Sequence, residues 1–265
     1  MTTPAPASAY FESLGHGRYR ATEHTEGPWS SLAQHGGPPC ALLTRALEGL
    51  DPRPDAMLSR ISVEFLRPVP VGELEVRATV ERPGRSVQLL SAEMLAGGTP
   101  VLAARAWQVQ RSEVTAGPPE PTPAQLPPTA SAPPPQIADR GYLRSIEWRA
   151  AAGDWLEPGP AAVWGRPRLP LIEGETMTGL QRLMTVVDSS SGISSALPWD
   201  GWLFINTDLT VHVAREPRGD WILLDAVTRV AEGGVGLATA AVGDADGMLG
   251  RSAQTLLVRP TPAAG

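Results

Sequence analysis

The sequence predicts an α+β protein with two similar units, each an antiparallel sheet wrapped around a central helix. Three observations lead to this fold class. A helical pattern followed by strand-like segments occurs twice, a proline-rich segment separates the two series, and short Pro/Gly turns connect the strands. We expect an N-terminal unit over 1–112, a linker over 113–139 and a C-terminal unit over 140–265, with enough chain to bury a core without crosslinks.

The first unit begins with a predicted helix over 38–50 (PPCALLTRALEGL). Its prolines occupy the first turn, where a missing amide donor is tolerated, and its leucines recur at helical spacing, so one face should be buried. Strands are expected next, over 58–66, 74–81, 86–95 and 101–110. The turns between them, RPVPVG, RPGR and AGGTP, are typical of an antiparallel meander.

The segment from Gly117 to Pro135 is predicted to be a surface linker, because proline at this density blocks both helix and sheet pairing. After it the order of elements recurs. A helix is expected over 175–190, starting near Glu175 or Thr176. Strands are expected over 202–213, 220–230, 235–242 and 250–258. Since one such unit leaves an open face, pairing two of them removes that face from water.

Composition and charge argue against several classes of protein. The net charge is −6 with Arg and Asp/Glu interleaved, so there is no basic stripe and nucleic acid is not expected as a partner. No apolar stretch approaches the ~20 residues that span a bilayer, and the N-terminus lacks the pattern of an export signal. Cys40 is the single cysteine, which suits a reducing compartment. We therefore expect a cytoplasmic protein without membrane contact.

Several reaction mechanisms lack the motifs that they require. No G-x-S-x-G sequence is present, so a serine-triad hydrolase is not expected. The histidines, His16, His24, His35 and His212, have no metal-ligand spacing among themselves or with Cys40. The Gly-Val-Gly segment of the second half lies within the meander and not at a strand-to-helix crossover, so it is no dinucleotide fingerprint. Neither a metal nor another cofactor is expected.

Each half carries a set of motifs that together resemble a known family. The first half contains His35-Gly36-Gly37-Pro38-Pro39 before its helix, then ISVEFLRPVPVGELEV and RPGRSVQLLSAEM. The second half contains Val187-Asp188 at its helix end, then FINTDLTVHVAREPRGDWILLDA and DGMLGRSAQTLLV. In this order, over roughly Tyr10 to Pro260, the motifs resemble double-hotdog acyl-CoA thioesterases of the thioesterase II type.

The resemblance implies a fold, a reaction and a state of association. The fold would be a double hotdog, with two fused hotdog units. The reaction would be hydrolysis of an acyl-CoA or acyl-carrier-protein thioester to the free acid and the thiol, within fatty acid metabolism. Exposed sheet edges and the resemblance together lead us to expect a homodimer or a homotetramer.

The resemblance also implies three residues that hold the attacking water, which are Asp188, Asn206 and Gln254 in this sequence. Asp188 follows an apolar helix face, where partial burial would strengthen it as a base; a lone aspartate at a helix end is otherwise a cap or a solvated group. Asn206 stands where the family often has threonine. Because its amide both donates and accepts, asparagine can orient a water as threonine does, although it is also a common strand-entry residue.

Strand alternation predicts which way the strand residues face. Asn206 and Asp208 should face one side and Thr207 the other, so Asp208 is the alternative acid if the register differs. Gln254 should point inward beside Leu256, where a water and the helix aspartate would satisfy its amide. The alternative for this glutamine is an exposed position on a half-solvated strand.

The first half is expected to bind substrate rather than to activate water. The position that matches the strand glutamine lies near Trp107, and the first helix has no aspartate where one would match that of the second half. At the helix start, His35, Gly36 and Gly37 can instead offer backbone N–H groups and the positive end of the helix dipole to the thioester oxygen. Glycine there permits close approach of the substrate, and the same segment also serves as a tight turn.

Two other functions compete with hydrolysis. The first is a non-hydrolytic acyl-thioester-binding or accessory protein on the same fold, which Asn206 in place of threonine motivates. The second is dehydration of a hydroxyacyl thioester, for which His35 is the candidate histidine at the helix start. Cys40 lies on an apolar helix face and is expected to pack, and the eight tryptophans are expected mainly in the core, with some lining an acyl tunnel.

Overall fold

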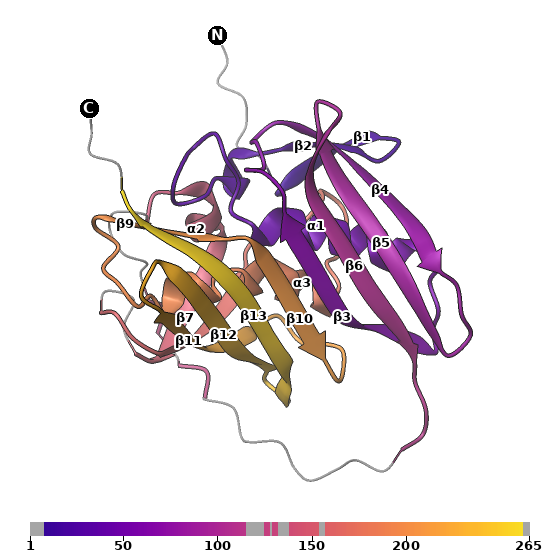
Figure 1. Cartoon of the computed structure of the whole chain (residues 1–265). Coiled ribbons are helices and arrows are strands. Elements are labelled where there is room, and N and C mark those ends of the chain that lie inside the picture. The colour runs from indigo at the N-terminus through magenta and orange to yellow at the C-terminus, as the bar shows by residue number, and fades with distance from the viewer. Residues whose placement is uncertain (1–7, 115–124, 128, 132–137, 154–156, 262–265) are drawn as a thin grey trace.

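The structure is a computed structural model that describes residues 8–114, 125–127, 129–131, 138–153 and 157–261. Most of the predicted linker, Gly117–Pro135, lies outside the described residues. Within them, thirteen strands form a single antiparallel sheet, and the helices α1 (Gly37–Leu50) and α3 (Gly179–Val187) pack against each other behind it (Figure 1). The two halves of the chain therefore share one sheet.

The sheet runs in the order β1-β2-β4-β5-β6-β3-β10-β13-β12-β11-β8-β7, and β9 pairs with β13. The strands are β1 (Phe11–Gly15), β2 (Arg18–Ala21), β3 (Ala56–Phe65), β4 (Glu73–Arg82), β5 (Val87–Ala96), β6 (Thr99–Gln110), β7 (Ile146–Ala152), β8 (Ala161–Pro167), β9 (Trp202–Asn206), β10 (Asp208–Val213), β11 (Ile222–Val230), β12 (Val235–Asp244) and β13 (Gly247–Pro260). Three further helical segments are short, namely η1 (Glu23–Thr25), α2 (Gly141–Ser145) and α4 (Ser190–Ile193).

The predicted helix and strands of the first half all form, and each end lies within two residues of its predicted place. In the second half the three strands β11 to β13 are also confirmed. The sequence did not predict β1, β2, β7, β8, α2 or α4. The predicted helix over 175–190 and the predicted strand over 202–213 differ from what is observed.

Helix α3 is shorter than predicted because its cap lies further along the chain. Thr178 Oγ1 accepts a hydrogen bond from the Gln181 amide at 3.1 Å, and Gln181 Oε1 accepts one from the Thr178 amide at 3.4 Å. This reciprocal capping box fixes the helix start, so Glu175 and Thr176 precede the helix. At the other end Asp188 is the C-cap, and the chain turns there into α4.

The predicted strand over 202–213 is split in two because its parts pair with different neighbours. β9 pairs with β13 alone, whereas β10 lies between β3 and β13. Thr207 is the junction, where its carbonyl accepts from the Phe65 amide at 2.9 Å and its amide donates to the Thr255 carbonyl at 3.0 Å. The junction brings the end of β3 beside the end of β9.

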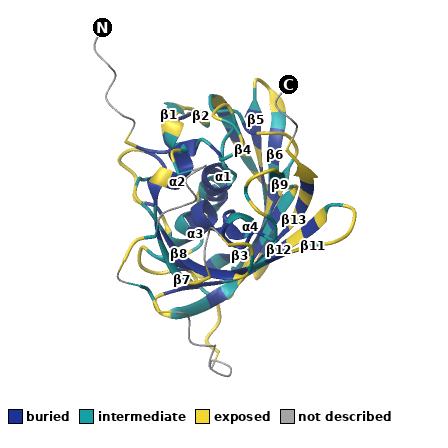
Figure 2. Ribbon diagram, turned by 90° about the vertical axis from the view of Figure 1, so that its left-hand side faces the viewer, coloured by how far each residue is buried: buried dark blue, intermediate teal, exposed yellow. Residues whose placement is uncertain are grey.

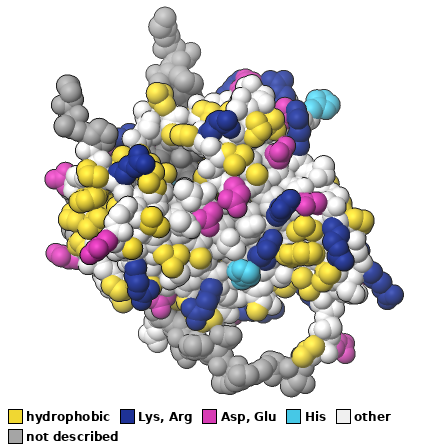
Figure 3. All heavy atoms as spheres, in the orientation of Figure 1, with side chains coloured by type: hydrophobic (Ala, Val, Ile, Leu, Met, Phe, Trp, Pro, Cys, Tyr) yellow, Lys and Arg dark blue, Asp and Glu magenta, His cyan; other side chains and the backbone are white. Residues whose placement is uncertain are grey.

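One hydrophobic core extends across both halves. At the seam, Ile61 pairs with Val211 and Val63 with Leu209, and all four side chains are buried. Figure 2 shows the buried helices at the centre of the molecule. On the outer face of the sheet, basic and acidic side chains are interspersed (Figure 3). No helix of the described chain is long and apolar enough to cross a membrane.

The two central helices run antiparallel and touch at both ends. The start of α1 meets the end of α3 so closely that a Cβ on Gly37 would lie 2.0 Å from the Thr185 carbonyl oxygen. At the other end, Glu48 accepts hydrogen bonds from Thr178 Oγ1 at 2.9 Å and Gln181 Nε2 at 2.7 Å. Burial raises the pKa of Glu48, although these two donors oppose the shift. The helix contact at Gly37 sets the geometry of the site described next.

Candidate active site

A cavity of about 690 Å³ opens where the two halves meet. Its walls come from 28–36 and 65–70 in the first half and from the end of α3, α4 and β9 in the second. Trp29, Trp199 and Phe204 form an aromatic cluster in this wall, with ring centroids 5.5 Å apart for the two tryptophans and 6.2 Å for each with Phe204. Two of the eight tryptophans thus line the cavity, while Trp148 and Trp164 lie in the core.

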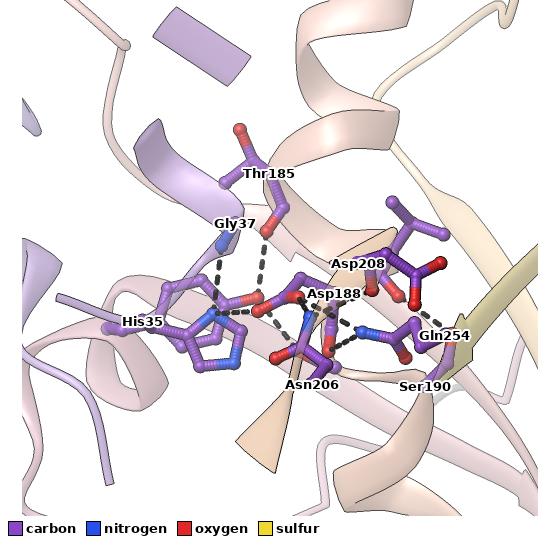
Figure 4. Close-up of polar contacts among 11 residues, drawn as sticks. His35, Gly37, Thr185, Asp188, Ser190, Asn206, Asp208 and Gln254 are labelled. Atoms are coloured by element: carbon purple, nitrogen blue, oxygen red, sulfur yellow. Dashed lines mark hydrogen bonds and ion pairs between the residues drawn. The ribbon is translucent and has the colours of Figure 1, made fainter. Parts of the chain in front are cut away.

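The three residues expected to hold a water contact one another (Figure 4), with Asp188 and Asn206 in the cavity wall and Gln254 buried behind them. Asp188 Oδ1 accepts hydrogen bonds from Asn206 Nδ2 at 2.8 Å and from Gln254 Nε2 at 3.0 Å. Gln254 Nε2 also lies 3.2 Å from the Asp188 carbonyl oxygen. Only 6% of Asp188 and none of Gln254 is exposed. One carboxylate oxygen is thus held by two amide donors in a largely dry place.

Strand geometry explains why these side chains converge. Gln254 and Leu256 are buried on β13, while Thr255 between them is exposed, as alternation predicts. Asn206 is the last residue of β9, just before the junction at Thr207. Asp208, the alternative acid, accepts from the Thr255 amide at 2.9 Å and is not in the cavity wall.

The side-chain oxygen of Gln254 can accept a further hydrogen bond. Its Oε1 is buried and has no hydrogen-bond partner among the described residues. An unpaired buried carbonyl of this kind costs about 1–3 kcal/mol, and one donor from a bound water would remove that cost. The amide nitrogen of the same side chain is held by Asp188, so the orientation of Oε1 is fixed.

His35 contacts Asp188, which the sequence did not predict. Its Nδ1 lies 3.2 Å from Asp188 Oδ2 and accepts a hydrogen bond from the Gly37 amide at 3.1 Å. The ring stacks on Tyr142 with centroids 3.6 Å apart and an interplanar angle of 7°. Tyr142 is itself fixed, since its hydroxyl donates to the Thr185 carbonyl at 2.9 Å. Burial lowers the pKa of His35 and outweighs the negative charge of Asp188, which favours the neutral ring.

The glycines at the start of α1 allow close approach, but the partners differ from those expected. A Cβ on Gly36 would lie 2.7 Å from Asp188 Oδ2 and from the Phe65 ring, so glycine here accommodates the protein's own side chains. The Gly37 amide was expected to face the thioester oxygen. In the structure it donates to His35 Nδ1 instead, because the tight turn folds the imidazole back over the helix start.

The first half contains a related polar cluster, so the prediction that it lacks these groups was wrong in part. Asp51 is the C-cap of α1, as Asp188 is of α3. Gln108, next to Trp107, donates to the Asp51 carbonyl at 3.2 Å, and Gln88 donates to Asp51 Oδ2 at 2.8 Å. None of these three residues lies in the wall of the cavity. The amides there bond to each other and to Asp51.

Within the described residues, no group of three or more His, Cys, Asp or Glu side chains could hold a metal ion. The site offers a carboxylate, two carboxamides, an imidazole and an apolar cavity.

Cys40 is buried on α1 and has no exposed surface, and burial raises the pKa of its thiol. Packing, as predicted, is its role.

The lowered pKa of His35 predicts how stability varies with pH. Above the unfolded pKa of about 6.5 both states are neutral at this ring; below it the unfolded state binds a proton that the folded state resists. The free energy of unfolding should fall with decreasing pH, by up to about 1.4 kcal/mol per unit, starting near pH 6.5. Urea unfolding of the wild type and His35→Asn measures it. In the variant, the free energy of unfolding should not show this fall. If it changed with pH in parallel in the two proteins, the prediction would be contradicted.

Comparisons with known proteins match both halves of the chain to one family. Two family models match, that of the acyl-CoA thioesterase N-terminal domain over residues 25–109 and that of the acyl-CoA thioesterase C-terminal domain over residues 118–258. No curated protein sequence matches the chain.

Solved structures resemble the chain over almost its whole length. A conserved protein of unknown function with hot dog fold from Alicyclobacillus acidocaldarius has a TM-score of 0.74 and 17% identity, covering 95% of this chain and 96% of that one. A putative thioesterase II from Thermobifida fusca YX has a TM-score of 0.73 and 19% identity, covering 96% of each chain. Acyl-CoA thioesterase II TesB2 from Mycobacterium marinum has a TM-score of 0.68 and 17% identity, also covering 96% of each chain. These similarities show the hotdog fold.

Proposed function

The chain belongs to the acyl-CoA thioesterase family, and from this premise we propose that it hydrolyses an acyl-CoA to the free acid and CoA. The observation that carries the proposal is the pair of amide donors on one oxygen of Asp188, beside an apolar cavity. Two donors fix the carboxylate and leave its second oxygen, Oδ2, to accept a proton from water. The water attacks the thioester bound in the cavity.

The reaction needs no group beyond those of the chain. The water oxygen forms a bond to the carbonyl carbon as Asp188 Oδ2 takes one of its protons. When the tetrahedral intermediate collapses, the carbon–sulfur bond breaks and the electron pair leaves on sulfur. The proton held by Asp188 then passes to the thiolate, which returns the carboxylate to its starting state. The products are a carboxylic acid and a free thiol.

The two carboxamides position the water and the base. The second O–H of the attacking water donates a hydrogen bond to Gln254 Oε1, which is buried and otherwise unpaired among the described residues. Asn206 takes the place that threonine often has in the family, and its Nδ2 donates to Asp188 at 2.8 Å. Both amides act on the water and the carboxylate without exchanging protons.

The cavity supports an acyl group as the part of the substrate that is buried. Aromatic and aliphatic side chains from both halves form most of its wall, which suits a hydrocarbon tail. The thioester comes from CoA or from an acyl carrier protein. We further propose that the chain is two fused hotdog units. The site requires both, because His35 and Phe65 come from one half and Asp188 from the other.

A thiol-release assay with acyl-CoA substrates of short, medium and long chains tests the proposal. Hydrolysis predicts free CoA and free acid in equal amounts. Tight binding of acyl-CoA without thiol release would instead support the non-hydrolytic alternative. Formation of an enoyl product from a 3-hydroxyacyl-CoA, with no thiol released, would support the dehydratase alternative.

Removing the side-chain amide of Gln254 tests whether it positions the attacking water or only stabilises the fold. Gln254→Ala should lower kcat by about 100-fold with little change in KM, because the water loses its acceptor and Asp188 loses a donor. The matched control is Gln108→Ala, which removes the corresponding contact to the C-cap of α1. It should lower stability and leave kcat unchanged. Equal effects of the two variants on kcat would count against the proposed site.

A further inference from the structure

The two ring nitrogens of His35 have different surroundings. Nδ1 faces the Gly37 amide at 3.1 Å and Asp188 Oδ2 at 3.2 Å. Figure 4 shows both contacts at this nitrogen and none at the other. Nε2 makes no hydrogen bond within the described part of the chain, and His35 lies in the cavity wall. One nitrogen is thus fixed by the protein and the other is available to a ligand.

The Gly37 amide determines where the ring carries its proton. A backbone N–H always presents hydrogen, so the nitrogen that accepts from it must have a free lone pair. A neutral imidazole has a single N–H, and here it must be at Nε2. Asp188 Oδ2 can donate to Nδ1 only after it has accepted the proton of the attacking water.

The surroundings of the ring hold it in this form. Tyr142 covers one face and is fixed by its hydrogen bond to Thr185. Burial lowers the pKa of His35, and the facing titratable groups are Asp188, whose charge opposes the shift, and Tyr142, whose own pKa is raised by burial. A neutral imidazole N–H in a cavity is a donor that can polarise a carbonyl without giving up its proton.

We propose that the His35 side chain is a catalytic residue that donates its Nε2–H to the thioester carbonyl oxygen. The proposal rests on the hydrolysis proposed above. The Gly37 amide already donates to His35 Nδ1, so the imidazole takes its place as the donor to the carbonyl oxygen. As the water adds, negative charge develops on the carbonyl oxygen, and a fixed donor at that place stabilises the transition state more than the ground state. No proton moves between His35 and the substrate.

Two substitutions of His35 separate its two nitrogens. Glutamine is long enough to place an amide nitrogen near the position of Nε2, so it keeps the donor and loses the contact of Nδ1. Asparagine reaches only the position of Nδ1, so its side-chain oxygen can still accept from the Gly37 amide while the donor is lost. Both replacements are uncharged, which keeps the comparison free of charge effects at Asp188.

The kinetic result expected is a larger loss for the shorter side chain. His35→Asn should lower kcat by about 100-fold or more, and His35→Gln should retain at least about 10 times the kcat of His35→Asn, with KM changed little in both. The opposite order would mean that Nδ1 donates to Asp188 as part of a dyad, and it would overturn the proposal. Equal losses in both variants would overturn it as well.

A second measurement does not depend on turnover. Long-range ¹H–¹⁵N NMR at about pH 7 distinguishes the two neutral imidazole tautomers and the imidazolium, and the spectrum of His35→Asn identifies the His35 signals among those of the four histidines. The proposal predicts neutral His35 with hydrogen on Nε2. Hydrogen on Nδ1, or an imidazolium, would overturn it even if the wild type hydrolyses acyl-CoA. Absence of thiol release by the wild type would overturn the hydrolysis, and with it the role of His35, whatever the tautomer.

Discussion

Replacing Asp188 by asparagine is expected to lower kcat by about 10³-fold and to leave KM within a few-fold of the wild-type value. Asparagine has the same shape, and its Oδ1 can still accept from Asn206 Nδ2 and Gln254 Nε2, so the folded site should persist. What it lacks is the basic oxygen that takes the water's proton. Steady-state kinetics with a thiol reagent measures the loss, and circular dichroism shows whether the fold is kept.

Asp208→Asn is the matched control for this prediction. Asp208 is the neighbouring carboxylate on β10, and its Oδ1 accepts from the Thr255 amide, a contact that asparagine also makes. Because this side chain lies outside the cavity wall and bonds to the Thr255 amide rather than to Asp188, kcat should stay within about twofold of the wild type. If Asp208→Asn were the inactive variant and Asp188→Asn the active one, the base would be on the strand and our assignment would be wrong.

The largest effect on stability is expected at the helix contact. In Gly37→Ala the new methyl group would meet the Thr185 carbonyl oxygen at 2.0 Å, so α1 and α3 must move apart. We expect a loss of about 2–4 kcal/mol in the free energy of unfolding, measured by urea denaturation. Since the same shift moves His35 away from Asp188, kcat should also fall.

Gly49→Ala is the control for this substitution, because Gly49 lies in the same helix and a Cβ there would have no atom within 4 Å. Alanine loses less backbone entropy than glycine and forms helix more readily, so this variant should gain about 0.5–1 kcal/mol. Similar losses in the two variants would mean that any side chain disturbs α1 and that the contact with Thr185 is not the cause.

Local patterns predicted β3 to β6, β11 to β13 and part of the site. Alternation on β13 correctly placed Gln254 inside, since Leu256 is buried with it and Thr255 is exposed. The start of α3 was also readable, because Thr178 and Gln181 form the T-x-x-Q pattern of a capping box; Glu175 and Thr176 were chosen instead. Here a local signal was present and was assigned to the wrong threonine.

Other features depend on contacts between distant segments. The strand break at Thr207 arises because β9 and β10 have different neighbours, and no local sequence signal marks it. The contact of His35 with Asp188 requires the antiparallel packing of α1 and α3. Tyr142 reaches His35 from α2, a segment that the sequence did not predict to be helical. The glycines at the start of α1 were identified from sequence, but the atoms that approach them could not be.

The central claim is that Asp188 activates a water and does not itself attack the thioester. Single-turnover hydrolysis of an acyl-CoA in H₂¹⁸O, with enzyme in excess, tests it most directly. Mass spectrometry of the acid and of the peptide that contains Asp188 locates the label. Our account predicts one ¹⁸O in the acid and none in Asp188. An unlabelled acid with ¹⁸O in the Asp188 carboxylate would show attack by the carboxylate through an anhydride and would contradict it.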